Sequence, residues 1–259
     1  MPKRSIIVQV HFFNNAGTSV ETILRKQFVK RFMCCEPGSA TETHPADALV
    51  PILEKNEAVQ AISSHTIRFP PPVRPGWKFY PIVFIRHPLD RILSMYNFER
   101  RQTVQSPGAI LAKQHGAAGY VMARLESPGE NTLRNYQASM LAGCTGDNET
   151  LLQAASKAVQ DLPVVGVVDE FRESIGQFST WLVPHFPGLF IRPIHRERGV
   201  LRGTSLEERI MHLRIIVGDE TFTRLEEENS VDLALYLQAR EKLETGRSRE
   251  RLSDTGIKV

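Results

Sequence analysis

A run of small and polar residues early in the chain has the composition of an anion-binding loop. It spans Asn14 to Ser19 (NNAGTS) and follows Ser5–Val10, an apolar, β-branched segment of strand length. Apolar residues recur at helical spacing after it, namely Val20, Ile23, Leu24, Phe28 and Phe32. A turn that joins a strand to a helix N-terminus collects backbone N–H groups and the positive end of the helix dipole. The segment is therefore a candidate anion site, and an ordinary βα turn is the alternative.

Local signals predict how this loop is built. Gly17 is free to take a positive φ, and Thr18 or Ser19 can cap the helix, with Glu21 in its first turn. The loop lacks the GxxxxGK[ST] pattern of a Walker A motif.

Further polar residues stand where predicted strands end. Strands are expected at Val59–Ser63, Phe79–Ile85, Leu162–Val168 and Leu189–Pro193. The polar residues that follow them include Ser64, His65, Arg86 and a basic loop at 195–199. Since ligands bind at the carboxyl ends of strands in parallel sheets, we expect these residues to share one site with the loop.

The remaining segments predict the covering helices. A helix should start at Pro88, with proline at its first position. Other helices are expected at 46–55, 118–126, 131–142, 148–160, 171–182, 205–215, 219–228 and 231–244, and loops at 69–76 and 104–117. This alternation predicts an α/β fold with a mostly parallel central sheet flanked by helices. We expect a single domain over 1–259, with a flexible tail from about 247.

Composition narrows the class of ligand. The 259 residues are 41% hydrophobic and carry a net charge of +3, which suits a small anionic ligand but falls short of a nucleic-acid-binding arm. No apolar run approaches a membrane span, and the basic start MPKR leads into a strand rather than a signal peptide, so a cytoplasmic location is expected. Cys34, Cys35 and Cys144 are expected to be free thiols, and no metal-ligand spacing occurs.

Two segments together resemble a known family. HFFNNAGTS (11–19) is similar to the phosphosulfate loop of sulfotransferases that use 3′-phosphoadenosine 5′-phosphosulfate (PAPS), in particular the carbohydrate (heparan/chondroitin) and bacterial branch. IRHPLDRILSMY (85–96) resembles the second signature of that family, RxPxxRxxSxY. Weaker echoes follow in the family's order, in SSHTIRF, NYQASMLAG, VGVVDEFRESI and VDLALYLQA. The resemblance covers almost the whole chain.

The resemblance implies a P-loop-like sulfotransferase fold and metal-free transfer of a sulfuryl group from PAPS to an acceptor hydroxyl or amine. Asn15, Ala16, Gly17, Thr18 and Ser19 would wrap the 5′-phosphosulfate, and Arg86 and Ser94 would hold the 3′-phosphate. His65 would be the general base, because neutral imidazole can take the proton of an attacking hydroxyl. His11 would support the loop, and His87 would be structural. Each of these roles has a structural alternative. Arg86 would instead form an ion pair with Asp90, Ser94 would only face a helix groove, and His65 would only form a hydrogen bond with a backbone carbonyl.

Other basic residues are less determined by the pattern. Arg91 is either a phosphate ligand or a helix charge. Arg196, Arg198 and Arg202 either close over the nucleotide or form a solvated basic loop.

Asn14 departs from the family pattern, which has lysine there to neutralise the bridging oxygen of the leaving group. Losing one such group commonly costs about 100- to 1,000-fold in rate. Three explanations stay open. Arg68 or Arg91 supplies the charge, the enzyme is slow, or the protein binds the donor without turnover.

The resemblance therefore favours a PAPS-dependent sulfotransferase, with a catalytically weak or silent PAPS-binding protein as the alternative. A P-loop kinase would need Mg²⁺-dependent ATP binding, and the absent GK[ST] counts against it. The acceptor would be a carbohydrate, a lipid or a small metabolite, with carbohydrate first through the resemblance. A soluble bacterial enzyme is the simplest expectation, a trimmed catalytic domain remains open, and the residues leave a homodimer undecided.

Overall fold

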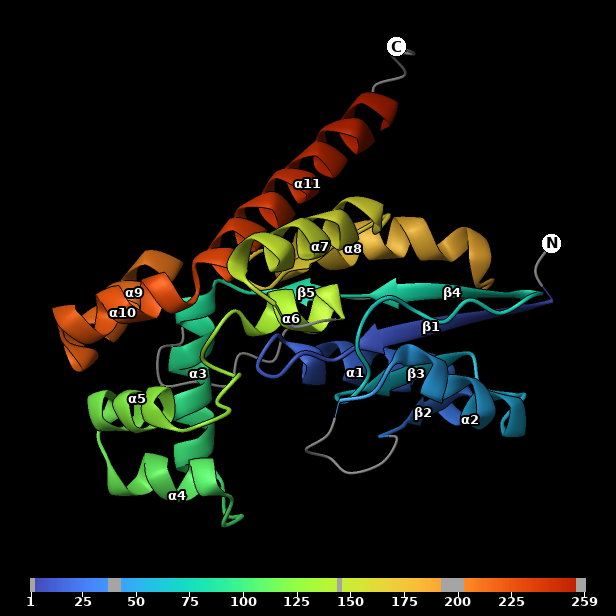
Figure 1. The fold of residues 1–259 in the computed structure, drawn as a ribbon. Helices are drawn as coiled ribbons and strands as arrows, with labels where there is room; N and C mark the ends of the chain where they lie inside the picture. Colours follow the sequence, from blue (N-terminus) through green and yellow to red (C-terminus); the bar gives the residue numbers. More distant parts are fainter. Residues whose placement is uncertain (1–2, 37–42, 144–145, 192–202, 255–259) are drawn as a thin grey trace.

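The computed structural model describes residues 3–36, 43–143, 146–191 and 203–254. It is an α/β fold with a mostly parallel central sheet flanked by helices (Figure 1). The larger sheet has the order β2-β3-β1-β4, with every pairing parallel. Its strands are β1 (Arg4–Val10), β2 (Phe32–Cys34), β3 (Ala61–Ser64) and β4 (Trp77–Ile82).

A second, two-stranded sheet extends the same layer. It pairs β5 (Phe84–Ile85) with β6 (Gly166–Val167), again in parallel. Only Val83 separates β4 from β5, so the short sheet continues the β4 edge of the larger one. The carboxyl ends of β1, β3 and β5 therefore lie along one side of the molecule.

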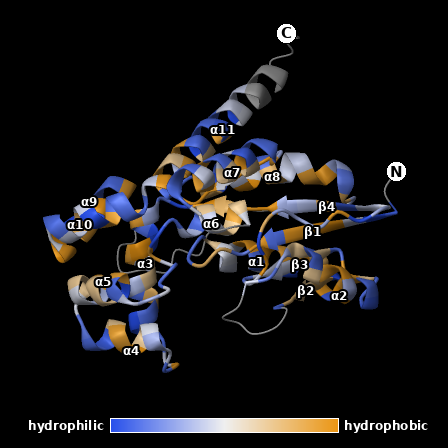
Figure 2. Cartoon of the chain, viewed as in Figure 1, coloured by the Kyte–Doolittle hydropathy of each residue, from blue (hydrophilic) through white to orange (hydrophobic). Residues whose placement is uncertain are grey.

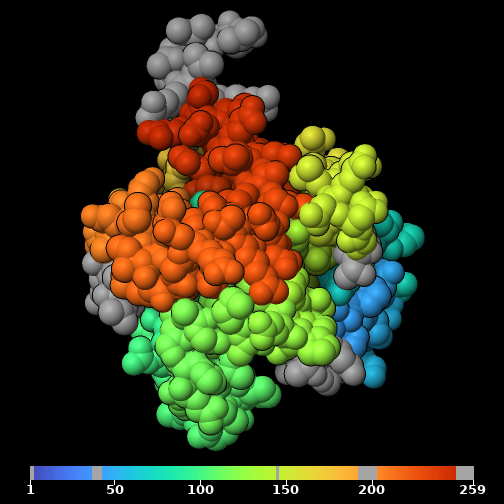
Figure 3. All heavy atoms as spheres, turned by 60° about the vertical axis from the view of Figure 1, so that its left-hand side comes forward, coloured from blue at the N-terminus to red at the C-terminus, as the bar shows by residue number. Residues whose placement is uncertain are grey.

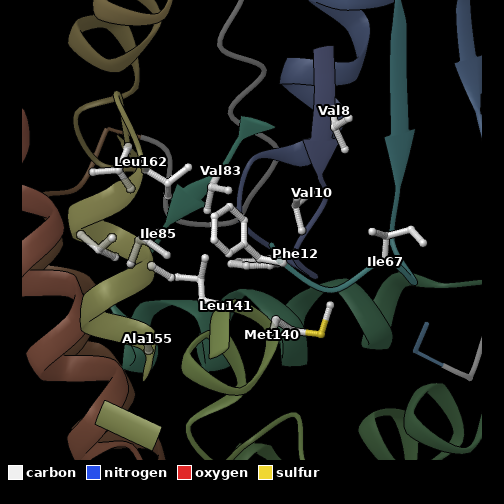
Figure 4. Packing of buried hydrophobic residues seen from close by; sticks show 14 of the residues in the cluster. Val8, Val10, Phe12, Ile67, Val83, Ile85, Met140, Leu141, Ala155 and Leu162 are labelled. Carbon is white, nitrogen blue, oxygen red and sulfur yellow. The ribbon is translucent and has the colours of Figure 1, made fainter. Parts of the chain in front are cut away.

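Alternate residues of β1 pack into two separate hydrophobic cores, because successive side chains of a strand point to opposite faces of the sheet. Ile6, Val8 and Val10 pack with α2 (Leu49–Lys55), α6 (Tyr136–Ala142), α7 (Asn148–Asp161) and α11 (Ser230–Asp254). Figure 4 shows side chains from β1, β5 and α6 converging around Phe12. Ile7 faces the other way, against α1 (Gly17–Phe28) and α8 (Phe171–Leu182).

A third core stands beside the sheet and is built mainly from helices. It joins α3 (Pro88–Arg101), α4 (Pro107–Gln114), α5 (Ala117–Glu126), α9 (Leu206–Val217) and α10 (Asp219–Glu228). Figure 3 shows this part from outside, with the orange α9–α10 segment lying on the green α4–α5 segment. Figure 2 shows β1 coloured as mainly hydrophobic, whereas hydrophilic residues are frequent along α11. No helix within the described ranges has the length and apolar composition needed to cross a membrane.

Most predicted elements are confirmed, with boundaries shifted by a few residues. The strands at β1, β3 and β4–β5 are present, Pro88 is at the first position of α3, and α8 has the predicted bounds. The short helix predicted at 46–55 is a 3-10 turn, Ala46–Ala48, followed by α2. The predicted strand Leu162–Val168 is reduced to β6.

Three predictions about secondary structure are wrong. Phe32 belongs to β2 rather than to the first helix, because a 3-10 turn (Val29–Arg31) ends that helix and Val29 takes a φ of 47°. The expected loop at 104–117 contains α4, since Ser106 accepts a hydrogen bond from the Ala109 N–H and Pro107 follows it at the first position.

The third error lies in the C-terminal part of the chain. Leu189–Ile191 form no strand, and the rest of the expected fifth strand lies outside the described residues. The helix α11 continues through part of the predicted tail as far as Asp254, and the flexibility of that tail stays a prediction.

Candidate functional site

The loop between β1 and α1 has a backbone built on left-handed residues. Asn14 has φ 63° and Ala16 has φ 58°, and Ala16 precedes the first residue of α1. The helix begins at Gly17, so the expected cap by Thr18 or Ser19 is wrong, and no side chain caps this helix. The N–H groups of Ser19 and Val20 donate to the Ala16 carbonyl, whereas those of Gly17 and Thr18 have no preceding helical turn to bond and stay available to an anion.

A positive φ is predicted for Gly17 from the sequence, but Gly17 is not among the positive-φ residues. Glycine is required at this position because a side chain would have no space. A Cβ added to Gly17 would lie 1.7 Å from Cδ2 and 1.8 Å from Nε2 of His11. The buried imidazole of His11 therefore occupies the room that any larger residue would need. The close approach also places this ring directly against the start of α1.

Buried amides fasten the loop to the sheet. Gln9 in β1 donates its Nε2 to the Gly17 carbonyl at 2.8 Å. Asn15 donates its Nδ2 to the Phe84 carbonyl at 2.7 Å and to Oε1 of Gln137 at 2.5 Å. The Asn15 side chain is 2% exposed and anchors the loop, and its backbone N–H donates to the Phe12 carbonyl at 3.2 Å. A part for Asn15 in wrapping the 5′-phosphosulfate stays a prediction.

Arg86 and Ser94 both reach the loop at Asn14. Arg86 donates its Nη1 to the Asn14 carbonyl at 2.9 Å, and Ser94 donates its Oγ to Oδ1 of Asn14 at 3.4 Å. These contacts join residues 72 and 80 positions apart in the chain. The structure thus brings the two sequence motifs to one point at the carboxyl edge of the sheet.

An ion-pair chain orients the Arg86 guanidinium. The Arg86 Nε lies 2.7 Å from the Asp90 carboxylate, which is the ion pair given above as the structural alternative for Arg86. Asp90 also forms an ion pair with Arg209 at 2.7 Å. Burial alone would raise the pKa of the Asp90 carboxyl, but the two arginines hold it below its usual range. A permanently ionised Asp90 keeps Arg86 fixed beside the loop.

Gln137 is a site residue that the motif comparison passed over. Its Oε1 accepts the Arg86 N–H at 2.9 Å, and its Nε2 donates to the Arg86 carbonyl at 2.9 Å. The same Oε1 accepts from Asn15, so one buried amide joins the loop to the end of β5. The only signal in the sequence was its place in the echo NYQASMLAG.

At the end of β3, His65 lies against the base of the loop. Its exposed ring stacks on His11 with a centroid distance of 3.6 Å. Glu36 was not singled out from the sequence. Its carboxylate accepts hydrogen bonds from the backbone N–H groups of His65 and Thr66 at 3.0 and 3.1 Å and from the Ser64 hydroxyl at 3.1 Å. An imidazole and a carboxylate therefore stand together at this strand end, and either is chemically able to accept a proton.

The remaining predicted residues divide as follows. Thr18 is exposed in the first turn of α1, whereas Ser19 is 4% exposed and its N–H donates to the Ala16 carbonyl at 2.9 Å. His87 packs edge-on against Tyr236 at 5.1 Å, in keeping with a structural role. Arg196, Arg198 and Arg202 lie outside the described residues. Cys34 and Cys35 are free, Cys144 is not described, and the described residues hold no metal-binding cluster.

The buried His11 predicts a pH-dependent stability. Burial, and then the neighbouring His65, lower the pKa of His11 to about 3. An unfolded chain binds this proton near pH 6.5, so the stability that neutral His11 contributes is complete above pH 6.5 and is lost as the pH falls toward 3. Urea unfolding from pH 7 to pH 4 should show a loss on the order of several kcal/mol. A His11→Gln variant should show a shallower loss, and equal slopes would contradict the assignment.

The fold and the site define an α/β protein in which a strand–loop–helix unit meets an arginine-bearing strand end at one edge of a parallel sheet. No family model matches the chain. The chain is 31% identical over 240 residues to an uncharacterized protein of Archaeoglobus fulgidus, a match that covers 90% of this chain and 95% of that protein. The chain belongs to the same family as this archaeal protein.

Proposed function

We propose that the chain is a PAPS-dependent sulfotransferase with a P-loop-like sulfotransferase fold. The observation that carries the proposal is the meeting of Arg86 and Ser94 at Asn14, within the loop that precedes α1. An anion-binding helix start and an arginine beside it suit a nucleotide with phosphate groups at two positions.

Each part of the site has a role in this proposal. The loop backbone at Ala16–Thr18, with the first turn of α1, takes the 5′-phosphosulfate. Arg86 and Ser94 take the 3′-phosphate, the arginine through its planar fork and the serine through its hydroxyl. Asp90 holds the arginine in place through their 2.7 Å ion pair.

The transfer requires one proton to leave the acceptor. As the acceptor oxygen forms its bond to sulfur, the bond from sulfur to the bridging oxygen breaks, and adenosine 3′,5′-bisphosphate departs. In the proposal, the His65 imidazole takes the proton that leaves the acceptor hydroxyl. Glu36 is the second candidate for this role, because its carboxylate lies 3.0 Å from the backbone nitrogen of His65. Asn14 offers the bridging oxygen a hydrogen bond without a charge.

An aromatic pair beside the loop favours a carbohydrate acceptor. Phe13 and Phe98 meet edge-to-face at 5.6 Å, and Phe98 is 39% exposed. Phe98 is one turn beyond Ser94 on α3, so the pair borders the Asn14–Ser94 contact. An exposed ring face is a suitable surface for the apolar face of a sugar. A cytoplasmic location forms part of the same proposal.

A silent PAPS-binding protein is the second candidate. It is favoured by one observation, the absence of any charged residue between His11 and Val20 in a loop that would face a developing negative charge. Donor binding is common to both candidates, and turnover separates them.

Donor binding is tested with adenosine 3′,5′-bisphosphate in calorimetric titrations without metal. Wild-type protein should bind at micromolar concentration or tighter, and Arg86→Ala should weaken binding by about 10- to 100-fold, as expected for a lost charged hydrogen bond. Asp90 keeps its ion pair with Arg209 in that variant, so the fold should persist.

Arg101→Ala is the matched control, because Arg101 lies exposed in the last turn of the same helix and its loss changes the net charge equally. Absence of binding to the wild type would overturn the proposal. Tight, Mg²⁺-dependent binding of ATP would instead favour a kinase.

A further inference from the structure

Arg91 is a fully buried cation whose hydrogen-bonding capacity is mostly unused. It is 0% exposed, and its Nη2 donates to the Thr132 carbonyl. Nε and Nη1 are buried without a hydrogen-bond partner among the described residues. Leaving buried donors of a charged group unpaired is costly, so such an arrangement calls for an explanation beyond packing.

The position of Arg91 connects it to the candidate site. It precedes Ser94 by one turn of α3, on the side of the helix that faces the loop. Its guanidinium carbon lies 4.7 Å from the centroid of the Tyr136 ring. The Tyr136 hydroxyl in turn accepts the N–H of Phe13 at 3.2 Å, immediately before Asn14 in the chain. A buried charge thus stands one aromatic ring away from the loop backbone.

The loop itself brings no fixed positive charge to an anion. Residues 11–19, HFFNNAGTS, include neither lysine nor arginine, and burial keeps His11 neutral by lowering its pKa to about 3. Arg68, the other candidate for this role, is partly exposed and donates its Nε to Thr43 at 2.9 Å.

We propose that Arg91, acting through Tyr136, supplies the positive charge beneath the 5′ end of the bound nucleotide and is a positioning residue for the loop. The inference rests on the proposed function. In a low-dielectric interior a charge acts over a longer distance than in water, so direct contact with the ligand is unnecessary.

Neighbouring charges leave this positive charge available. Burial lowers the pKa of the Arg91 guanidinium, and the nearby Asp232 opposes this shift. The Asp232 oxygens accept the backbone N–H groups of Gln137 at 3.1 Å and of Ala138 at 2.8 Å, and the described ion pairs include none between Asp232 and Arg91. Arginine keeps its proton in proteins, so the guanidinium carries its charge without a carboxylate against it.

The test compares two ligands that differ only at the 5′ end. Adenosine 3′,5′-bisphosphate and adenosine 3′-monophosphate are titrated into wild type, Arg91→Met and Arg91→Lys. Arg91→Met should weaken the bisphosphate by about 10-fold or more, as for a lost charged interaction, and leave the monophosphate nearly unchanged. Arg91→Lys should recover most of the loss.

The controls separate charge from fold. Arg134 forms an ion pair with Glu228, so Arg134→Met also removes one positive charge. This variant should leave the affinity for both ligands unchanged. Thermal unfolding of Arg91→Met should match the wild type, because an apolar replacement for a buried charge is often neutral or stabilising. If that variant does not fold, Arg91→Gln keeps a donor for Thr132 and gives the same comparison.

Equal losses for the two ligands, or no loss for either, would overturn the role of Arg91 and leave the donor site intact. A wild-type protein that binds neither ligand would overturn the proposed function itself. The two failures are therefore distinct.

Discussion

Asn14→Lys should raise the rate of sulfuryl transfer from PAPS by about 100- to 1,000-fold, the usual effect of one preorganised charge or donor at a reacting centre. The backbone carbonyl of Asn14, which Arg86 holds at 2.9 Å, is unaffected by the change of side chain. Lysine at a left-handed φ of 63° costs roughly 1–2 kcal/mol, so the variant should fold with reduced stability. Release of adenosine 3′,5′-bisphosphate under single-turnover conditions, with a panel of carbohydrate acceptors, measures the gain.

Asn14→Gln is the matched control, since it lengthens the side chain and adds no charge. It should leave the rate near that of the wild type, and the affinity for adenosine 3′,5′-bisphosphate should change little in either variant. If neither the wild type nor Asn14→Lys transfers sulfuryl to any acceptor although both bind the donor, the silent-protein candidate replaces the enzyme. In the Arg91→Met background, lysine should also restore the bisphosphate affinity that the loss of Arg91 removes.

Gly17→Ala should be among the most damaging single methyl additions in the described chain. The new Cβ would overlap the buried imidazole of His11, on which the His65 ring packs at a centroid distance of 3.6 Å. Overpacking of this kind costs typically about 1–3 kcal/mol, and either the loop or the imidazole must move. Chemical denaturation should show the loss of stability, and calorimetry should show lost donor binding.

Gly176→Ala provides the control for the change in residue type. Gly176 lies within α8, and an added Cβ would meet no atom within 4 Å, so alanine should stabilise the helix by about 0.5–1 kcal/mol. In a His11→Ala background Gly17→Ala should cost little, because the overlapping ring is gone. A comparable loss in both backgrounds would show that the overlap is not the cause.

The sheet was predictable because its strands are short apolar runs separated by turn signals. Ile6 to Val10 could only be buried on both sides, and the two cores that receive alternate residues of β1 show the reason. Phe32 and the segment at 104–117 were misjudged for opposite reasons. Phe32 fits a helical period yet completes a sheet edge, and the Ser106–Pro107 pair that suggested a loop starts a helix.

The position of the loop and of the two motifs could be predicted from the sequence, but the contacts of several side chains could not. The spacing placed Arg86 and Ser94 near the loop, and both contact Asn14. It could not show that Asn15 turns inward, because its two acceptors come from β5 and α6, and a linear motif holds no information about such distant partners. Glu36 and Gln137 were missed for the same reason, since each is defined by what it binds in space.

The late position of α11 in the chain has a consequence for biosynthesis. Asp232 accepts the first N–H groups of α6, and Asn135 accepts the N–H groups of Val231 and Asp232 in return. α6 in turn carries Gln137, the amide that joins the loop to β5. A nascent chain that has completed the described strands therefore still lacks part of the support for the loop before α1. Under the proposed function, the start of α11 must leave the ribosome before the donor site is complete.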